Sequence, residues 1–285
     1  MEFKTYIFYC SPAGTTRHVG QVAARTLRER GGQVVVGELG RDEAGTARLL
    51  DKIANVPERV CVFVGSPVYA SHALPPVMDF IARLPRRREA FAVPFVTWGG
   101  ASSGLALLDM GRALAASGYC LAGAAKVVAV HSLMWEAAEP LAGGHPDAED
   151  DRQVAELVAG VAENLARPEP LRLAAEALAY QPAAAAGILA GQSLDLARRT
   201  LPPREADAEL CTGCGICVEN CPVAALSLAP RPVFSAACIL CFNCVRSCPE
   251  KAFAVDLAPV HEYIRQRARD FGEQPLTAIF EPGRE

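Results

Sequence analysis

The 285-residue sequence has no uncharged apolar run long enough to cross a bilayer, so we expect no membrane-spanning helix. It also lacks a basic stripe and an acidic tract, and its formal net charge is only −4. The lack of a basic stripe argues against nucleic acid or an anionic membrane surface as a partner, and the lack of an acidic tract argues against a disordered tail. The N-terminus runs directly into the apolar stretch Tyr6–Tyr9, without the layout of a secretory signal. We therefore expect a cytoplasmic protein, whose oligomeric state the sequence leaves unknown.

Several nucleotide and catalytic motifs are missing as well. The sequence contains neither the Gly-Lys-Ser/Thr of a Walker loop nor the Gly-x-Gly-x-x-Gly of dinucleotide sites. No general base, nucleophile or nicotinamide site is evident. We therefore assign no catalytic residue, and whether the chain is an enzyme stays open.

Cysteine is abundant, by contrast, and eight of the eleven cysteines form an internal repeat. Two runs share the spacing Cys-x-x-Cys-x-x-Cys-x-x-x-Cys-Pro, namely CTGCGICVENCP and CILCFNCVRSCP. Each cysteine of the first run recurs 27 positions later, from Cys211 and Cys238 to Cys221 and Cys248. A short loop can wrap a cubane cluster when its thiolates recur every third residue, so the spacing predicts [4Fe-4S] clusters.

Two other roles for these cysteines are weaker. A zinc site would need cysteine pairs separated by a longer loop, and it would leave most of the eight thiols without a partner. A disulfide framework would require an oxidising compartment. The remaining cysteines, Cys10, Cys61 and Cys120, lie in or beside apolar segments and are predicted to be small buried hydrophobes.

From Lys4 to about Arg167, short apolar runs alternate with amphipathic stretches, which is typical of a parallel sheet covered on both faces. The predicted strands are Thr5–Cys10, Gln33–Val36, Arg59–Gly65, Phe91–Trp98 and Ala124–Val130. The predicted helices are Thr16–Arg30, Asp42–Ala54, Leu74–Leu84, Ser103–Ser117 and Glu149–Ala166. Five strands alternating with five helices predict an α/β fold, a flavodoxin-like doubly wound five-stranded parallel sheet.

Three loops follow strands of this sheet and are therefore expected at one edge, where ligands bind in such folds. The first is Ser11–Thr16, which could hold a phosphate at the N-terminus of the following helix, although a Ser/Thr-rich turn is more often only a helix cap. The other two loops, at Ser66–Tyr69 and Thr97–Gly100, each carry one large aromatic residue. Together the three loops favour a flavin. The candidate cofactor-binding residues are Ser11, Ala13, Gly14, Thr15, Thr16, Ser66, Pro67, Val68, Tyr69, Thr97, Trp98, Gly99 and Gly100.

On these motifs the chain resembles the flavodoxin-ferredoxin fusion proteins of anaerobic metabolism. Ser11, Gly14 and Thr16 match the phosphate loop of flavodoxins, whereas Ala13 replaces a threonine. The resemblance implies FMN as cofactor, with Tyr69 and Trp98 as stacking rings. It also implies two [4Fe-4S] clusters in which the fourth cysteine of each run serves the other run's cluster. The implied ligand sets are Cys211, Cys214, Cys217 and Cys248 for one cluster, and Cys238, Cys241, Cys244 and Cys221 for the other.

We therefore divide the chain into four parts. Residues 1–167 are expected to be the flavodoxin-like FMN-binding domain, 168–205 a helical linker of two short helices, 206–257 an α+β two-cluster ferredoxin module, and 258–285 a closing helix and tail. Within the module, Ala225–Leu228 and its repeat Ala252–Leu257 are predicted as short strands. The module should dock over the flavin end of the sheet and contact Tyr69 or Trp98.

The expected function is electron transfer between one-electron clusters and FMN, with redox proteins as partners. Two alternatives remain open. One is an FMN-dependent reductase of a small acceptor, such as a quinone or disulfide, that receives its electrons through the clusters. The other is a cluster-based redox sensor without flavin.

Overall fold

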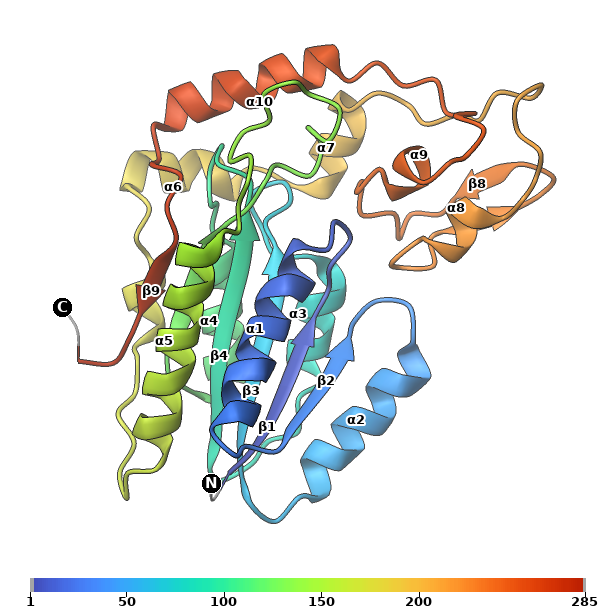
Figure 1. Cartoon of the computed structure of the whole chain (residues 1–285). Coiled ribbons are helices and arrows are strands. Elements are labelled where there is room, and N and C mark those ends of the chain that lie inside the picture. The colour runs from blue at the N-terminus through green and yellow to red at the C-terminus, as the bar shows by residue number, and fades with distance from the viewer. Residues whose placement is uncertain (1–2, 284–285) are drawn as a thin grey trace.

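The computed structural model describes residues 3–283, and its centre is a mostly parallel sheet (Figure 1). The strands are β1 (Phe3–Tyr9), β2 (Val34–Glu38), β3 (Arg59–Pro67), β4 (Ala90–Trp98), β5 (Cys120–Leu121), β6 (Ala124–Val128) and β9 (Ala278–Phe280). They lie in the order β2-β1-β3-β4-β6-β9, and β5 pairs with β4. The five main strands are parallel and follow the order 2-1-3-4-5 of flavodoxin-like doubly wound folds, which confirms the predicted fold class.

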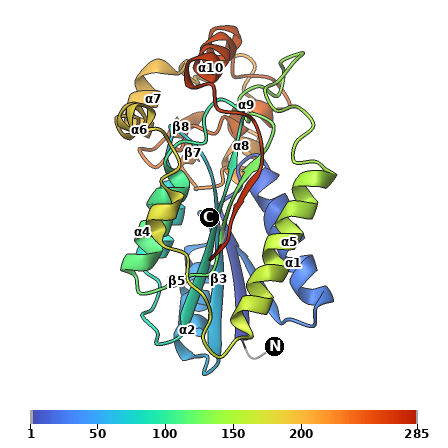
Figure 2. The ribbon, with the colours of Figure 1, turned by 90° about the vertical axis from the view of Figure 1, so that its left-hand side faces the viewer.

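Helices cover both faces of the sheet. They are α1 (Thr15–Glu29), α2 (Glu43–Asn55), α3 (Pro75–Ala82), α4 (Ala106–Ala116) and α5 (Ala148–Leu165). Helices α1 and α5 pack on one face, and α2, α3 and α4 pack on the other; Figure 2 shows α4 and α5 on opposite sides of the sheet. Each of these helices and each of the five main strands begins and ends within three residues of its predicted position.

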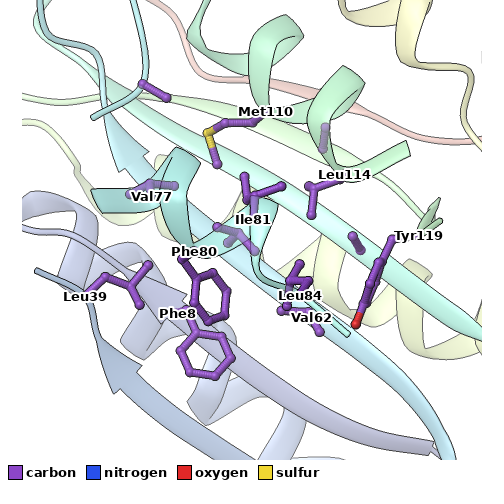
Figure 3. Close-up of a cluster of buried hydrophobic side chains, with 14 of the residues drawn as sticks. Phe8, Leu39, Val62, Val77, Phe80, Ile81, Leu84, Met110, Leu114 and Tyr119 are labelled. Carbon is purple, nitrogen blue, oxygen red and sulfur yellow. The ribbon is translucent and has the colours of Figure 1, made fainter. Parts of the chain in front are cut away.

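Alternate residues of β1 supply the two apolar layers. Ile7 packs against α1 and α5, whereas Phe8 faces α3, where its ring lies 4.5 Å from that of Phe80 between ring centroids (Figure 3). Every residue of β4 is buried. Burial on both faces explains why the strands read as continuous apolar runs in the sequence.

The chain then crosses above the sheet before it forms the cysteine-rich module. The crossing contains a 3₁₀ helix η1 (Ala175–Leu178) and two α-helices, α6 (Ala183–Ala190) and α7 (Leu194–Thr200), so that two α-helices are found as predicted, with one additional 3₁₀ turn. The module contains α8 (Ile216–Glu219), β7 (Leu226–Leu228), β8 (Pro232–Phe234) and α9 (Asn243–Arg246), and α10 (Ala258–Phe271) follows it. No helix within residues 3–283 is both long and apolar enough to cross a membrane.

Two expectations for the C-terminal part need correction. The predicted strand Ala252–Leu257 is wrong: in the described chain only Phe253 pairs, in an isolated antiparallel bridge with Ala206, and β7 pairs with β8. The segment after α10 is more than a tail, since β9 returns to the main sheet and pairs antiparallel with β6. A three-residue strand is too short to give an alternation pattern that identifies it.

The cysteine-rich module lies over the carboxyl ends of the parallel strands (Figure 1). Arg41 donates hydrogen bonds to the backbone oxygens of Val218 and Glu219, and the amide of Asn243 donates to the Pro12 oxygen at 2.7 Å. Gly40 is required for the close approach, because a Cβ atom there would lie 2.5 Å from the Pro222 oxygen. These contacts fix the module against the loop after β2 and against the predicted phosphate loop.

Candidate functional site

A cavity of about 310 Å³ lies at the carboxyl ends of the strands, between the sheet and the cysteine-rich module. Its floor comes from the three loops that the sequence singled out, and the predicted residues in its walls are Ala13, Thr15, Thr16, Pro67, Val68, Tyr69, Thr97, Trp98 and Gly99. Its roof comes from α7, from Ile239 and Leu240 of the second cysteine run, and from α10. The predicted docking of the module next to Tyr69 and Trp98 is therefore confirmed.

The other four predicted residues support the loops from behind. The hydroxyl of Ser11 accepts a hydrogen bond from the backbone N–H of Arg17, and buried Ser66 donates to the Pro67 oxygen and accepts from the N–H of Leu74. Gly14 and Gly100 have positive φ angles of 90° and 74° and turn their loops. None of these four side chains lines the cavity, so they act as scaffold.

The first loop places the N-terminus of α1 at the cavity. Helix α1 begins at Thr15, and Ala13, Thr15 and Thr16 all line the cavity wall. The hydroxyls of Thr16 and Thr97 are 2.7 Å apart and join the first loop to the third. The backbone N–H groups and the partial positive charge of a helix N-terminus favour an anion, so this end of the cavity suits a phosphate.

Trp98, one of the two rings expected to stack on the flavin, is almost fully buried. Its side chain is only 1% exposed, and the Lys126 ammonium lies 5.1 Å from its ring centroid. The indole Nε1 is buried and has no hydrogen-bond partner among the described residues. An unsatisfied buried donor costs about 1–3 kcal/mol, so an acceptor atom on a bound ligand would stabilise this arrangement. Tyr69 is half-buried.

Sequence reasoning missed the loop that follows β6. Residues 129–133 line the cavity, and they follow the fifth main strand just as the predicted loops follow the first, third and fourth. His131 is part of this wall: burial and the nearby His261 lower its pKa to about 4, so it is neutral at pH 7. Its Nδ1 accepts a hydrogen bond from the N–H of Leu133. The strand-end rule alone would have identified this loop.

A buried ionic network holds the third loop in place. The Lys126 ammonium lies 2.5 Å from a carboxylate oxygen of Glu273, and the side chains are only 12% and 14% exposed. Glu273 also accepts hydrogen bonds from the backbone and hydroxyl of Ser103 and from Gln181. Burial by itself raises the pKa of Glu273, but the hydrogen bonds from Lys126 and Ser103 outweigh it, and the pKa lies below its usual value. The network thus ties the segment after α10 to the loop that carries Trp98.

Replacement of Glu273 by alanine is expected to lower stability by about 3 kcal/mol, because it leaves the buried Lys126 without its counter-ion. This corresponds to a fall in the thermal midpoint of roughly 6 °C or more. Because the pKa of Glu273 is lower in the folded state than in the unfolded state, its contribution to stability is complete at a pH above the unfolded-state pKa. This contribution is lost as the pH falls through the folded-state pKa. The loss of stability in Glu273→Ala relative to the wild type should therefore be constant from neutral pH down to about pH 5.

The matched control is Glu262→Ala, which removes an exposed partner of Arg269 from α10. Exposed ion pairs contribute about 0–1 kcal/mol, so the midpoint of this variant should change little. Equal midpoints for the two variants in thermal unfolding followed by circular dichroism would contradict the anchoring role of Glu273.

The eight repeat cysteines surround two small cavities within the module. Cys211, Cys214, Cys217 and Cys248 line one cavity, whereas Cys221, Cys238, Cys241 and Cys244 line the other. Each group combines three cysteines of one run with the fourth of the other. All eight thiols are free of disulfides. Four convergent thiolates are the donor set that a [4Fe-4S] cluster requires, so the residues fit this group.

The two runs share a backbone path but not the residues on it. Gly213 and Gly215 of the first run have φ angles of 70° and 82°, and Leu240 and Phe242, 27 positions later, have φ angles of 60° and 59°. The repeat therefore extends from the sequence to the backbone conformation. Leucine and phenylalanine adopt left-handed geometry only at a cost in strain, so the second run places large side chains where the first has none.

Comparisons with known proteins match the two parts separately. Residues 204–249 match the family described as a 4Fe-4S dicluster domain. A search of curated proteins finds no match to the chain.

Among solved structures, a flavodoxin from the domain Archaea is 17% identical over 57% of this chain and 99% of its own, with a TM-score of 0.43. The flavodoxin 2 of Bacillus cereus is 17% identical over 56% and 98%, with a TM-score of 0.43. The rubredoxin oxygen:oxidoreductase of Desulfovibrio gigas is 21% identical over 57% of this chain, with a TM-score of 0.45, and the match spans only 36% of that enzyme.

The fold assignment itself rests on the strand order described above. The chain therefore joins a flavodoxin-like doubly wound fold to a C-terminal 4Fe-4S dicluster segment, and this combination supports a role in redox electron transfer.

Proposed function

We propose that the protein is an electron-transfer protein that exchanges single electrons between two [4Fe-4S] clusters and one FMN, and passes them to or from redox partner proteins. Clusters carry one electron at a time, and FMN accepts one or two, so a chain with both groups can couple one-electron transfer to two-electron transfer. The observation that carries the proposal is the cavity whose floor is the flavodoxin-like loops and whose roof includes Ile239 and Leu240 of a cysteine run.

FMN is the ligand that best suits this cavity. The N-terminus of α1 offers a site for the phosphate, and the unpaired Nε1 of Trp98 offers a donor for an acceptor atom of the ring system. Tyr69 and Trp98 supply aromatic walls. We propose the same FMN-binding loops as the sequence predicted, with residues 129–133 added as a further wall.

The cluster ligands are proposed on the grouping of the cysteines. One set comprises Cys211, Cys214, Cys217 and Cys248, and the other Cys221, Cys238, Cys241 and Cys244, because each set surrounds its own cavity. We name these the outer cluster and the inner cluster, respectively. Ile239 lines both the inner-cluster cavity and the FMN cavity, so the inner cluster is the one adjacent to the flavin.

The composition of the anaerobically purified protein tests the proposal. We expect about eight irons, eight sulfides and one FMN per chain, because each of two [4Fe-4S] clusters brings four irons and the cavity holds one flavin. Iron and sulfide assays combined with the absorbance of the released flavin give these numbers. Zinc in place of iron would remove the cluster assignment, and clusters without any flavin would favour the sensor alternative.

A second candidate is an FMN-dependent reductase of a small acceptor. A groove of about 680 Å³ lies next to the FMN cavity and shares Tyr69, Leu194 and Ile239 with it, so it offers space for a small molecule close to the flavin. Steady-state turnover of a quinone or disulfide that saturates with substrate concentration would favour this candidate. Exchange with protein partners alone would favour the carrier.

A further inference from the structure

The inner and outer clusters differ in the charge placed next to their ligands, and this difference rests on the same cysteine sets as the proposed function. Arg204 follows Pro202 and Pro203 at the end of the crossing segment and lines the inner-cluster cavity. Its Nη1 lies 3.2 Å from the Sγ atom of Cys238 and donates a hydrogen bond to it. No other arginine or lysine among residues 3–283 forms a side-chain hydrogen bond to a repeat cysteine sulfur.

Two aromatic rings hold the Arg204 guanidinium against this sulfur. Its central carbon lies 4.7 Å from the ring centroid of Phe234 and 4.8 Å from that of Phe242. Phe242 is completely buried and sits in the left-handed backbone conformation. A bulky residue tolerates that conformation only where the surroundings compensate for the strain, and stacking on a cation is one such compensation. The two rings thus position the guanidinium, which the cysteine sulfur also attracts.

The internal repeat supplies a natural comparison. Arg231 lies 27 positions after Arg204 and occupies the same place relative to its own run, but it is exposed and forms no hydrogen bond to a cysteine sulfur in the described chain. Gly215 stands where the second run has Phe242, so the outer cluster has no equivalent of that ring, although Phe253 lines its cavity. An arginine therefore stands at this position before both runs, but in the described residues only Arg204 donates a hydrogen bond to a cysteine sulfur.

The two cavities also differ in burial. Cys221, Cys238 and Cys244 of the inner set are buried, whereas Cys214 of the outer set is exposed. Reduction adds one negative charge to a cluster that its thiolates already make anionic, so burial alone disfavours reduction of the inner cluster. A permanently charged guanidinium that donates to a ligand sulfur acts in the opposite direction.

We propose that Arg204 raises the reduction potential of the inner cluster and so favours transfer of one electron from the reduced outer cluster to the oxidised inner cluster, beside the FMN cavity. In this step the outer cluster loses the electron that the inner cluster gains, and no proton or further reactant is required.

The test is a redox titration of the full-length, anaerobically prepared protein, followed by EPR of the reduced clusters. In Arg204→Gln, one of the two cluster potentials should fall such that the equilibrium constant for electron transfer between the clusters changes by about tenfold or more. For a one-electron couple, tenfold corresponds to about 59 mV. Arg231→Gln is the matched control and should leave both potentials unchanged.

Arg204→Lys keeps the charge but loses the planar fork, so its potential should lie between those of the wild type and Arg204→Gln. If Arg204→Gln does not retain its iron, Arg204→Lys carries the test, and a downward shift in it supports the proposal. Unchanged potentials in an iron-replete Arg204 variant, or equal shifts in the Arg231 control, would overturn it. The result does not depend on flavin, so a wild type that binds clusters without FMN would refute the proposed function while leaving this test intact.

Discussion

Replacement of Ala129 by tryptophan is expected to abolish flavin binding while leaving the iron content unchanged. Ala129 follows β6, is buried, and lies in the wall of the FMN cavity, where its backbone N–H donates to the Trp98 oxygen. An indole at this position would occupy much of a cavity of about 310 Å³. Flavin content should fall by at least about tenfold, the factor that corresponds to 1.4 kcal/mol of lost binding free energy.

The control for this variant is Ala183→Trp, which places the same ring on the exposed surface of α6, away from the cavity. It should keep both flavin and iron at the wild-type ratio. Overpacking of a wall can also cost stability, so thermal midpoints of both variants are measured alongside the iron assay. One FMN per chain in the Ala129→Trp variant would show that the flavin does not bind in this cavity.

The floor of this cavity could be predicted from sequence because each of its parts is local. A strand such as Arg59–Pro67 is visible as an apolar run, and the loop after it must lie at the carboxyl edge of a parallel sheet. The same rule would have found His131, had the loop after β6 been included. The two cysteine runs are also local patterns: their spacing predicts which three thiols of each run can meet around a cluster, whereas the fourth thiol, from the other run, was implied by the resemblance.

Apart from the docking of the cysteine-rich module, the roof of the cavity could not be predicted, because it depends on contacts between segments far apart in the chain. Tyr263 and Arg267 reach the cavity from α10, whose sequence shows only an amphipathic helix. The pairing of Lys126 with Glu273 joins residues 147 positions apart, and no spacing rule connects them. The burial of Trp98 follows from these contacts. A sequence that ends at Arg167 would lack the roof and β9, so tests of flavin binding require the full chain.

Replacement of Cys221 by alanine is expected to slow reduction of the flavin by on the order of a hundredfold, even though Cys221 belongs to the first cysteine run. Its side chain is buried and lines the inner-cluster cavity together with Cys238, Cys241 and Cys244. Without the inner cluster, electrons on the outer cluster have no nearby acceptor, and the flavin depends on collisions with the donor. Intramolecular delivery gains about 10²–10⁴ over such encounters at ordinary concentrations, and this gain would be lost.

The experiment follows flavin absorbance after rapid mixing of the oxidised protein with a reduced, low-potential protein donor. The wild type should show cluster reduction and then a flavin phase whose rate is independent of protein concentration. In Cys221→Ala the flavin phase should become slow and depend on donor concentration, while the EPR signal of the outer cluster persists. Cys120→Ala, which removes a cysteine outside the repeat, should behave like the wild type.

Cys248→Ala distinguishes crossed from uncrossed ligand sets. Cys248 lines the outer-cluster cavity with Cys211, Cys214 and Cys217, so its loss should remove the outer-cluster EPR signal and leave that of the inner cluster. Because the inner cluster then remains next to the flavin, direct reduction of it by the donor should still give a flavin phase. If Cys248→Ala abolishes the inner-cluster signal and Cys221→Ala the outer one, each run holds its own cluster and the crossed arrangement is wrong. If Cys221→Ala reduces its flavin as fast as the wild type, the inner cluster is not the flavin's electron donor.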